Sequence, residues 1–217
     1  MERTKEQIIE LITKRVAKDF KDGYLVNLGI GMPVMATKYI PKGMNVILQS
    51  ENGMLGMGAM PPKGEENPRI TTAGGQPSSI NEGGMFFDSA FSFSLIRGGH
   101  VDITVLGALE VDEEGNLANW IIPGKLVPGM GGAMDLVNGV KKVIITMEHT
   151  DKSGASKIKK KCSLPLTGVR CVDRLITELA VFDFEDGKMK LVELQEGATL
   201  EEVQEKTEAS FQNCLKS

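Results

Sequence analysis

Residues 45–58 join a short apolar run to a carboxylate and three glycines: Asn45-Val46-Ile47-Leu48-Gln49-Ser50-Glu51-Asn52-Gly53-Met54-Leu55-Gly56-Met57-Gly58. The apolar run predicts a strand. Glycine tolerates positive φ and lets backbone approach a ligand closely, so an open, ligand-facing turn is expected after the strand. Ligands of open α/β sheets bind beyond the carboxyl ends of the strands, where Glu51 stands. The alternative interpretation of Glu51 is a solvated loop carboxylate.

Composition is that of an ordinary globular protein. The 217 residues are 41% hydrophobic and 25% charged, which favours one domain spanning residues 1–217. The net charge of −4 gives no basic footprint for nucleic acid or an anionic membrane. No apolar run approaches the roughly 20 residues that cross a bilayer. We therefore expect neither nucleic acid nor membrane as a partner.

The cysteines, histidines and N-terminus bear on location and metal binding. The charged start, Met1 to Glu6, lacks the apolar core of a signal peptide. Three cysteines, an odd number without metal-ligand spacing, predict free thiols in the cytoplasm. Only two histidines are present, so no metal site is expected. These features predict a cytoplasmic, metal-free protein.

Strand and helix patterns alternate along the chain. Strands are predicted at 25–28, 45–48, 101–106, 117–122 and 143–147, and helices at 8–20, 34–39, 86–97, 135–139 and from 199. A long loop is predicted over 59–85, a turn over 111–116, a helix–strand segment over 172–181 and a hairpin across Asp186-Gly187. This alternation predicts an α/β fold with an open, mainly parallel sheet flanked by helices.

Two further glycine motifs follow or precede predicted elements. Gly29-Ile30-Gly31 begins like a dinucleotide fingerprint, but the third glycine is missing, so the nucleotide signal is weak. Two glycines before a helix can still hold an anion or a backbone-like ligand. The other motif is Val127-Pro128-Gly129-Met130-Gly131-Gly132-Ala133-Met134-Asp135. Its N–H groups can converge as an oxyanion hole requires, and the alternative is a tight turn before a helix.

Several motifs together resemble the β subunit of family I CoA-transferases. They are Asn27-Leu28-Gly29-Ile30-Gly31, Ser50-Glu51-Asn52-Gly53, Ile96-Arg97-Gly98-Gly99-His100, Leu117-Ala118-Asn119-Trp120, Gly131-Gly132-Ala133-Met134-Asp135 and Pro165-Leu166-Thr167-Gly168. The resemblance runs in order from the first helix to about residue 205 and implies an open α/β layer fold.

The resemblance also implies the site and the chemistry. Glu51 is expected to be the catalytic nucleophile, forming a glutamyl-CoA thioester. The other site residues it implies are Gly131, Gly132 and Ala133 as oxyanion or CoA-binding groups, and Asn27, Gly29, Gly31, Asn52 and Gly75 near substrate or CoA. Coenzyme A is then a substrate, and no permanently bound cofactor is required. The expected partner is the α (alpha) subunit of a CoA-transferase, in a hetero-oligomer.

The residues near Gly75 bear on substrate choice. Succinate-using relatives carry lysine at this position, where it can pair with a second carboxylate. Gly75 therefore favours an acetate/butyrate–acetoacetate enzyme, and the alternative is the β subunit of a succinyl-CoA:3-oxoacid CoA-transferase. One departure is Ile80-Asn81-Glu82-Gly83 in place of the expected Leu-Pro-Gly, which leaves the shape of the neighbouring pocket open.

Two rival classes remain. A sugar-phosphate isomerase-like enzyme of similar architecture would need a basic phosphate clamp, and no Arg or Lys lies between Lys42 and Lys63. A non-catalytic ligand-binding protein has no need for Glu51 within an intact motif.

Overall fold

A ten-stranded sheet forms the centre of the molecule. The computed structural model describes residues 3–124 and 129–216. The strand order is β13-β12-β11-β10-β8-β5-β1-β2-β3-β4, and the five strands from β10 to β2 run parallel. The strands are β1 (Leu25–Leu28), β2 (Ile47–Ser50), β3 (Met54–Met57), β4 (Ile80–Phe86), β5 (Ile103–Gly107), β8 (Val143–Thr146), β10 (Arg174–Ile176), β11 (Ala180–Glu185), β12 (Lys188–Leu194) and β13 (Gln212–Asn213). The predicted open, mainly parallel sheet is confirmed.

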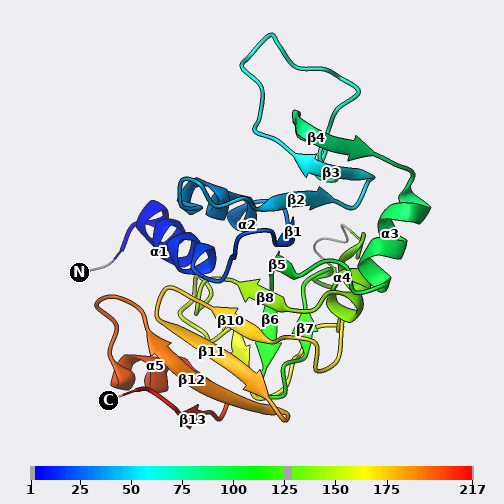
Figure 1. The fold of residues 1–217 in the computed structure, drawn as a ribbon. Coiled ribbons are helices and arrows are strands. Elements are labelled where there is room, and N and C mark those ends of the chain that lie inside the picture. Colours follow the sequence, from blue (N-terminus) through cyan, green and yellow to red (C-terminus); the bar gives the residue numbers. More distant parts are fainter. Residues whose placement is uncertain (1–2, 125–128, 217) are drawn as a thin grey trace.

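Helices cover the sheet on both faces (Figure 1). The helices are α1 (Lys5–Ala17), α2 (Met32–Met35), the 3-10 helix η1 (Ala36–Tyr39), α3 (Ser89–Arg97), α4 (Ala133–Gly139) and α5 (Leu200–Lys206). Ile12 and Val16 of α1 pack on Val26 and its neighbours in one core layer. Ile96 of α3 and Leu136 of α4 belong to the layer on the opposite face. The sheet is thus buried on both sides, as parallel sheets usually are.

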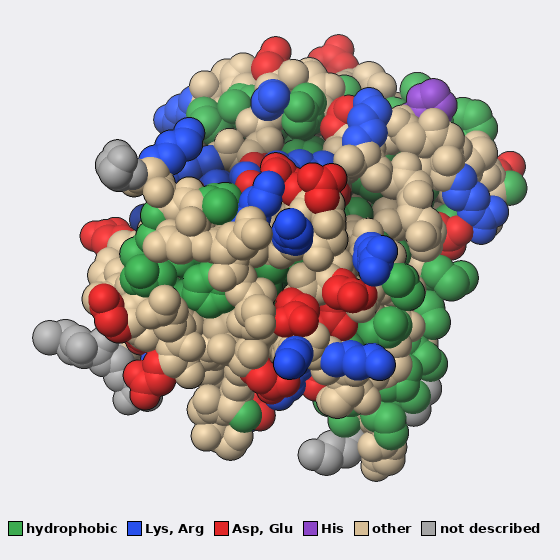
Figure 2. Space-filling model, turned by 90° about the horizontal axis from the view of Figure 1, so that it is seen from below, with side chains coloured by type: hydrophobic (Ala, Val, Ile, Leu, Met, Phe, Trp, Pro, Cys, Tyr) green, Lys and Arg blue, Asp and Glu red, His purple; other side chains and the backbone are tan. Residues whose placement is uncertain are grey.

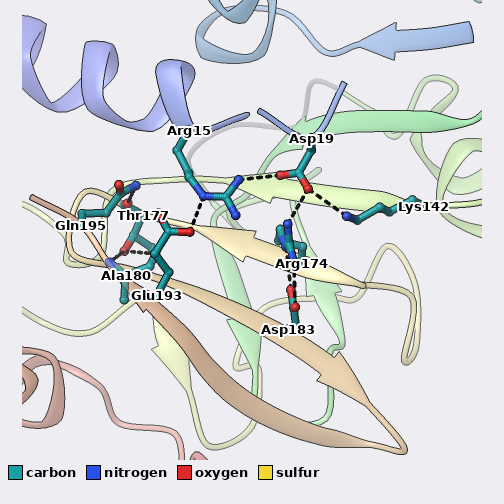
Figure 3. Close-up of polar contacts among 9 residues, drawn as sticks. All are labelled: Arg15, Asp19, Lys142, Arg174, Thr177, Ala180, Asp183, Glu193 and Gln195. Carbon is teal, nitrogen blue, oxygen red and sulfur yellow. Dashed lines mark hydrogen bonds and ion pairs between the residues drawn. The ribbon is translucent and has the colours of Figure 1, made fainter. Parts of the chain in front are cut away.

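Asp19, which follows α1, connects the N-terminal helix to the second half of the chain through hydrogen bonds and ion pairs (Figure 3). Its nearly buried carboxylate accepts hydrogen bonds from Arg15 (2.9 Å), Lys142 (3.0 Å) and Arg174. Arg174 on β10 also forms two hydrogen bonds with Asp183 on β11, at 2.6 and 2.8 Å. One carboxylate therefore links α1 to two strands that lie more than 120 residues further on.

A smaller sheet lies outside the main one. Its order is β7-β6-β9, formed by β6 (Glu110–Asp112), β7 (Leu117–Ala118) and β9 (Ile158–Lys159). On the face shown in Figure 2, the described acidic and basic side chains are interspersed. Within the described residues, none of the helices has both the length and the apolar character needed to span a bilayer.

Some predicted elements differ from the structure. The helix expected within 172–181 is wrong, because β10 and β11 are joined there by a tight turn. Thr177 makes that turn, its Oγ1 accepting from the N–H groups of Leu179 (3.2 Å) and Ala180 (3.1 Å). The expected strand at 117–122 is only two residues long, and the turn expected over 111–116 begins after residue 112, because β6 includes Val111 and Asp112. The hairpin at Asp186-Gly187 and the helix from residue 200, capped by Thr199, are confirmed.

The largest correction concerns the segment after Glu51. Two antiparallel strands, β3 and β4, occupy residues predicted as an open turn and as the end of a long loop. Glycines weaken strand propensity, and Gly56 at φ +78 lies where the β3–β4 register shifts. Glu51 therefore begins the turn of a β2–β3 hairpin. Gly53 closes this turn with φ +118, and a Cβ on it would lie 2.0 Å from the Phe87 carbonyl oxygen.

Candidate active site

A row of buried polar side chains crosses three neighbouring parallel strands. Asn27 on β1 pairs in register with Gln49 on β2 and with Thr104 on β5. Paired residues of parallel strands project to the same face, so the three side chains lie side by side. Glu51 follows Gln49 by two positions, just beyond the carboxyl end of β2. The sheet thus brings Glu51 and Asn27 together, two residues that the family resemblance had implied for the site.

Glu51 faces a cavity of about 670 Å³, here called the Glu51 cavity. Its lining comes from residues 27–31, 49–51, 72–74, 76–78 and 129–133, with single contributions from 34, 35, 57, 58, 60, 106 and 136. Among the described residues of this lining, Glu51 is the one ionisable side chain. A single carboxylate among mostly apolar lining residues suits a carboxylate nucleophile, since a substrate that fills the cavity displaces water from it.

The Glu51 side chain is held between an amide and a glycine. Asn27 Nδ2 donates to Glu51 Oε2 at 3.2 Å and to Gln49 Oε1 at 2.7 Å. On the other side, a Cβ on Gly132 would lie 3.2 Å from Glu51 Cγ and 3.4 Å from the Phe93 ring. Gly132 has φ −79, which any residue adopts. The close approach, and not the backbone conformation, therefore calls for glycine at position 132.

The glycine turn before α4 supplies N–H groups next to Glu51. Within residues 3–124 and 129–216, the Gly131 and Gly132 N–H groups donate to no described acceptor. The Ala133 N–H already donates to the Met130 carbonyl at 3.1 Å. Of the three residues predicted as oxyanion or CoA-binding groups, all line the cavity, and the N–H groups of Gly131 and Gly132 have no described acceptor. Val127 and Pro128, which the predicted motif includes, lie outside the described residues.

The residues on either side of Glu51 anchor the 58–79 loop. Ser50 Oγ accepts from the Ala73 N–H at 2.9 Å, and Asn52 Nδ2 donates to the Thr71 carbonyl at 2.8 Å. Asn52 is therefore directed at this loop and does not line the cavity, and Gly75 at the loop tip does not line it either. Both were expected near substrate or CoA, which stays a prediction; Asn52, in the β2–β3 turn, holds the loop that forms one wall, and Gly75 belongs to that loop.

The Gly29–Gly31 loop and residues 80–83 are also placed by the structure. Gly29 and Gly31 both line the Glu51 cavity, and a Cβ on Gly29 would lie 3.1 Å from the Val105 carbonyl oxygen. The unexpected residues Ile80 to Gly83 lie on the edge strand β4 and contribute nothing to the described lining. The departure from the family pattern therefore falls outside the cavity wall.

Cysteine is not a competing nucleophile at this site. All three cysteines are free, as expected, and none lines the cavity. Burial raises the pKa of the Cys171 thiol to about 11 and also raises the pKa of Cys162. Both thiols are therefore protonated at neutral pH. The described residues contain no group of His, Cys, Asp and Glu side chains arranged to hold a metal ion.

Sequence patterns did not identify Gln49 and Ser92 as site residues. Gln49 lies in the lining, and its Nε2 donates to Ser92 Oγ on α3 at 2.9 Å. The sequence does contain a signal for this network, because Asn27, Gln49 and Thr104 are polar residues within otherwise apolar strands. Buried amides need partners, so two of them in neighbouring strands indicate a shared network.

Comparison with known proteins identifies the class to which this fold and site belong. The coenzyme A transferase family model matches residues 9–206. The chain belongs to this family, and it is an enzyme that transfers CoA between an acyl-CoA and a carboxylic acid.

Individual relatives are similar over nearly their whole length. The chain is 58% identical over 200 residues to the β-type (B) chain of the probable succinyl-CoA:3-ketoacid coenzyme A transferase of Bacillus subtilis, covering 92% of this chain and 93% of that one. It is also 58% identical over 202 residues to the β subunit of the acetate CoA-transferase of Haemophilus influenzae, covering 93% and 90%. Among solved structures, an acyl-CoA transferase of Escherichia coli O157:H7 aligns with a TM-score of 0.77 at 21% identity. That alignment covers 100% of this chain and 44% of the larger protein, and it shows the shared fold.

Proposed function

We propose that Glu51 is the nucleophile of this transferase and carries CoA as a glutamyl thioester. One observation carries the proposal: Glu51 is the only described ionisable group of its cavity and lies against a glycine turn whose Gly131 and Gly132 N–H groups have no described acceptor. No described cation of the cavity neutralises this carboxylate. The N–H groups of the neighbouring glycine turn can serve as an oxyanion site.

Transfer proceeds in balanced steps. A Glu51 oxygen attacks the thioester carbonyl of the acyl-CoA, the C–S bond breaks, and a mixed anhydride and CoA thiolate form. The thiolate attacks the Glu51 carbonyl, the C–O bond to the first acid breaks, and that acid leaves as a carboxylate. The resulting Glu51–CoA thioester passes CoA to a second carboxylate by the reverse sequence. Each attack generates an oxyanion, for which Gly131 and Gly132 are the proposed donors; losing one such donor typically costs about 3–4 kcal/mol.

The proposed partner is an α subunit, because the relatives of similar length are named as the β-type half of two-chain transferases. The partner would form the second wall of the Glu51 cavity, whose mouth carries the exposed apolar side chains Ile30 and Met60.

We further propose one domain over residues 1–217, since the main sheet takes strands from both halves of the chain. A cytoplasmic location and the lack of a permanently bound cofactor stay predictions from the sequence.

For the substrates, we propose short acids of the acetate, butyrate and acetoacetate type. The support is Gly75, which offers no cation for a second carboxylate. Equal sequence identity to a succinyl-CoA transferase and to an acetate transferase keeps the succinyl-CoA:3-oxoacid alternative open.

A sugar-phosphate isomerase-like role finds no support, because the described lining residues include no Lys or Arg. A non-catalytic role finds none either, because Glu51 faces the cavity.

The experiment is to trap the covalent intermediate. The chain, co-purified with its α subunit, is incubated with acetyl-CoA without acceptor and examined by intact-protein and peptide mass spectrometry. We expect the mass of CoA added at Glu51 and removed when acetoacetate is supplied. A CoA adduct on another residue, or turnover without any adduct, would refute the proposal.

A further inference from the structure

Two buried amides stand between Glu51 and helix α3. Asn27 Nδ2 donates to Gln49 Oε1 (2.7 Å) and to Glu51 Oε2 (3.2 Å), with a longer contact to the Gln49 backbone carbonyl (3.4 Å). Gln49 Nε2 points the other way and donates to Ser92 Oγ at 2.9 Å. Thr104 Oγ1 closes the row with a 3.4 Å hydrogen bond to Asn27 Oδ1. The order of hydrogen bonds is therefore Ser92, Gln49, Asn27, Glu51.

The orientation of one amide fixes the orientation of the other. An amide presents an acceptor on one side and donors on the other. If Gln49 turned over, its NH2 group would meet the NH2 group of Asn27. Asn27 would then have to turn as well, and its oxygen would face the Glu51 carboxylate, which only accepts. The hydroxyls of Ser92 and Thr104 both donate and accept, so they tolerate either arrangement. The amide pair is therefore the part of the network that is orientation-sensitive.

Burying these four polar side chains costs folding free energy, which suggests that they serve the site. Asn27 and Gln49 are each 1% exposed, and Ser92 and Thr104 are fully buried. Burying an amide costs free energy that its hydrogen bonds only offset, whereas Val or Ile would fill a central strand position without that cost. The described side chains leave no buried polar atom without a partner, so the network is complete.

We propose that Gln49 is a positioning residue that holds the Asn27 amide in the one orientation in which its N–H donates to Glu51. The proposal rests on the proposed function of Glu51 and extends it. The hydrogen bond from Asn27 limits the rotation of the Glu51 side chain, so the carboxylate stays directed at the thioester and close to Gly132. Ser92 holds the far end of the Gln49 side chain from α3.

The test is a double-variant cycle in the complex with the α subunit. Gln49→Met removes the amide at nearly constant length, and Asn27→Ala removes the donor to Glu51. With acetyl-CoA and acetoacetate as probes, we expect Gln49→Met to lower kcat roughly ten- to a hundredfold while KM for acetyl-CoA stays within about twofold. Because Gln49 acts through Asn27, the double variant should be no slower than Asn27→Ala alone. Losses that multiply in the double variant would overturn the proposal.

Matched controls separate positioning from packing. Ser92→Ala should lower kcat in the same direction as Gln49→Met, by a smaller factor. Ser94→Ala, on the same helix but exposed and bonded only to the Phe91 carbonyl, should leave kcat unchanged. If Gln49→Met does not fold, the cycle of Ser92→Ala with Asn27→Ala carries the same test. A wild-type complex that forms no CoA adduct would refute the proposed function, whereas an adduct with independent losses refutes only the role of Gln49.

Discussion

Glu51 Cγ lies beside the position that a side chain on Gly132 would take: a methyl group on the Gly132 α carbon would lie 3.2 Å from it. Such a distance is tighter than ordinary van der Waals contact, so either the side chain or the turn has to move. An added carbon at Gly132 therefore displaces either the proposed oxyanion donors or the proposed nucleophile by a few tenths of an ångström.

Gly132→Ala should lower kcat more than it weakens acyl-CoA binding, because the added methyl displaces groups used chiefly in the transition state. A fall of roughly a hundredfold in kcat is expected from displacing one donor. Gly107→Ala is the matched control, since a Cβ there meets nothing within 4 Å. Steady-state kinetics of both variants provide the measurement, and equal losses in kcat and in binding would indicate a purely structural turn.

Glu51→Ala should abolish transfer and leave the fold intact, because a turn side chain contributes little to stability. Loss of a nucleophile typically costs roughly a thousandfold or more in kcat. Glu82→Ala, an exposed carboxylate on β4, is the control and should keep full activity. Activity assays are paired with thermal unfolding, and near-normal turnover of Glu51→Ala would contradict the mechanism.

Gly75→Lys should raise activity toward succinate relative to acetate through a charge-assisted contact. Gly75 has φ +74, so any side chain introduces strain there, and Gly75→Gln matches both that strain and the side-chain length. The ratio of kcat/KM values for the two acids is the readout. If lysine and glutamine give the same ratio, Gly75 does not determine specificity.

Ser50→Ala should loosen the loop wall next to Glu51. The Ala73 N–H loses its acceptor at 2.9 Å, a change worth about 1 kcal/mol. Amide hydrogen exchange should speed up over residues 70–77 while the sheet strands stay protected, and KM for acyl-CoA should rise. Unchanged exchange at Ala73 would show that Ser50 does not hold the loop.

His149 makes the stability of the protein pH-dependent. Its fully buried ring lies between Thr177 Oγ1 and Thr207 Oγ1, each at 2.9 Å, and burial lowers its pKa from 6.5 to about 4. The neutral ring is stabilising above pH 6.5. As the pH falls from 6.5 to 4 the unfolded chain takes up a proton that the folded chain does not, and the free energy of unfolding falls by on the order of 3 kcal/mol. Urea unfolding between these pH values should show a weaker pH dependence for His149→Gln, and identical curves would contradict this.

The parallel centre of the sheet could be predicted because its strands are apolar and end in glycines or polar residues. Glu51 and Gly132 were also predictable, through motifs whose spacing the sheet brings together. The β3–β4 pair was missed because Gly53, Gly56 and Gly58 mask the strand pattern, while pairing with β2 stabilises the strands. Only the structure shows that the Ala133 N–H donates within the turn, so its predicted role as an oxyanion donor stays a prediction. The Gln49 network depends on cross-strand register, which sequence spacing does not specify.

The three hydrogen bonds to Asp19 also bear on how the chain is made. During synthesis the N-terminal helix leaves the ribosome before Lys142 and Arg174 are made. Until then the Asp19 carboxylate lacks two of its three described cationic partners. Burial of the Asp19 carboxylate therefore depends on residues from the second half of the chain. A chain truncated after β5 would contain Glu51 but would lack Lys142 and Arg174, which leaves Arg15 of the three cations described around Asp19.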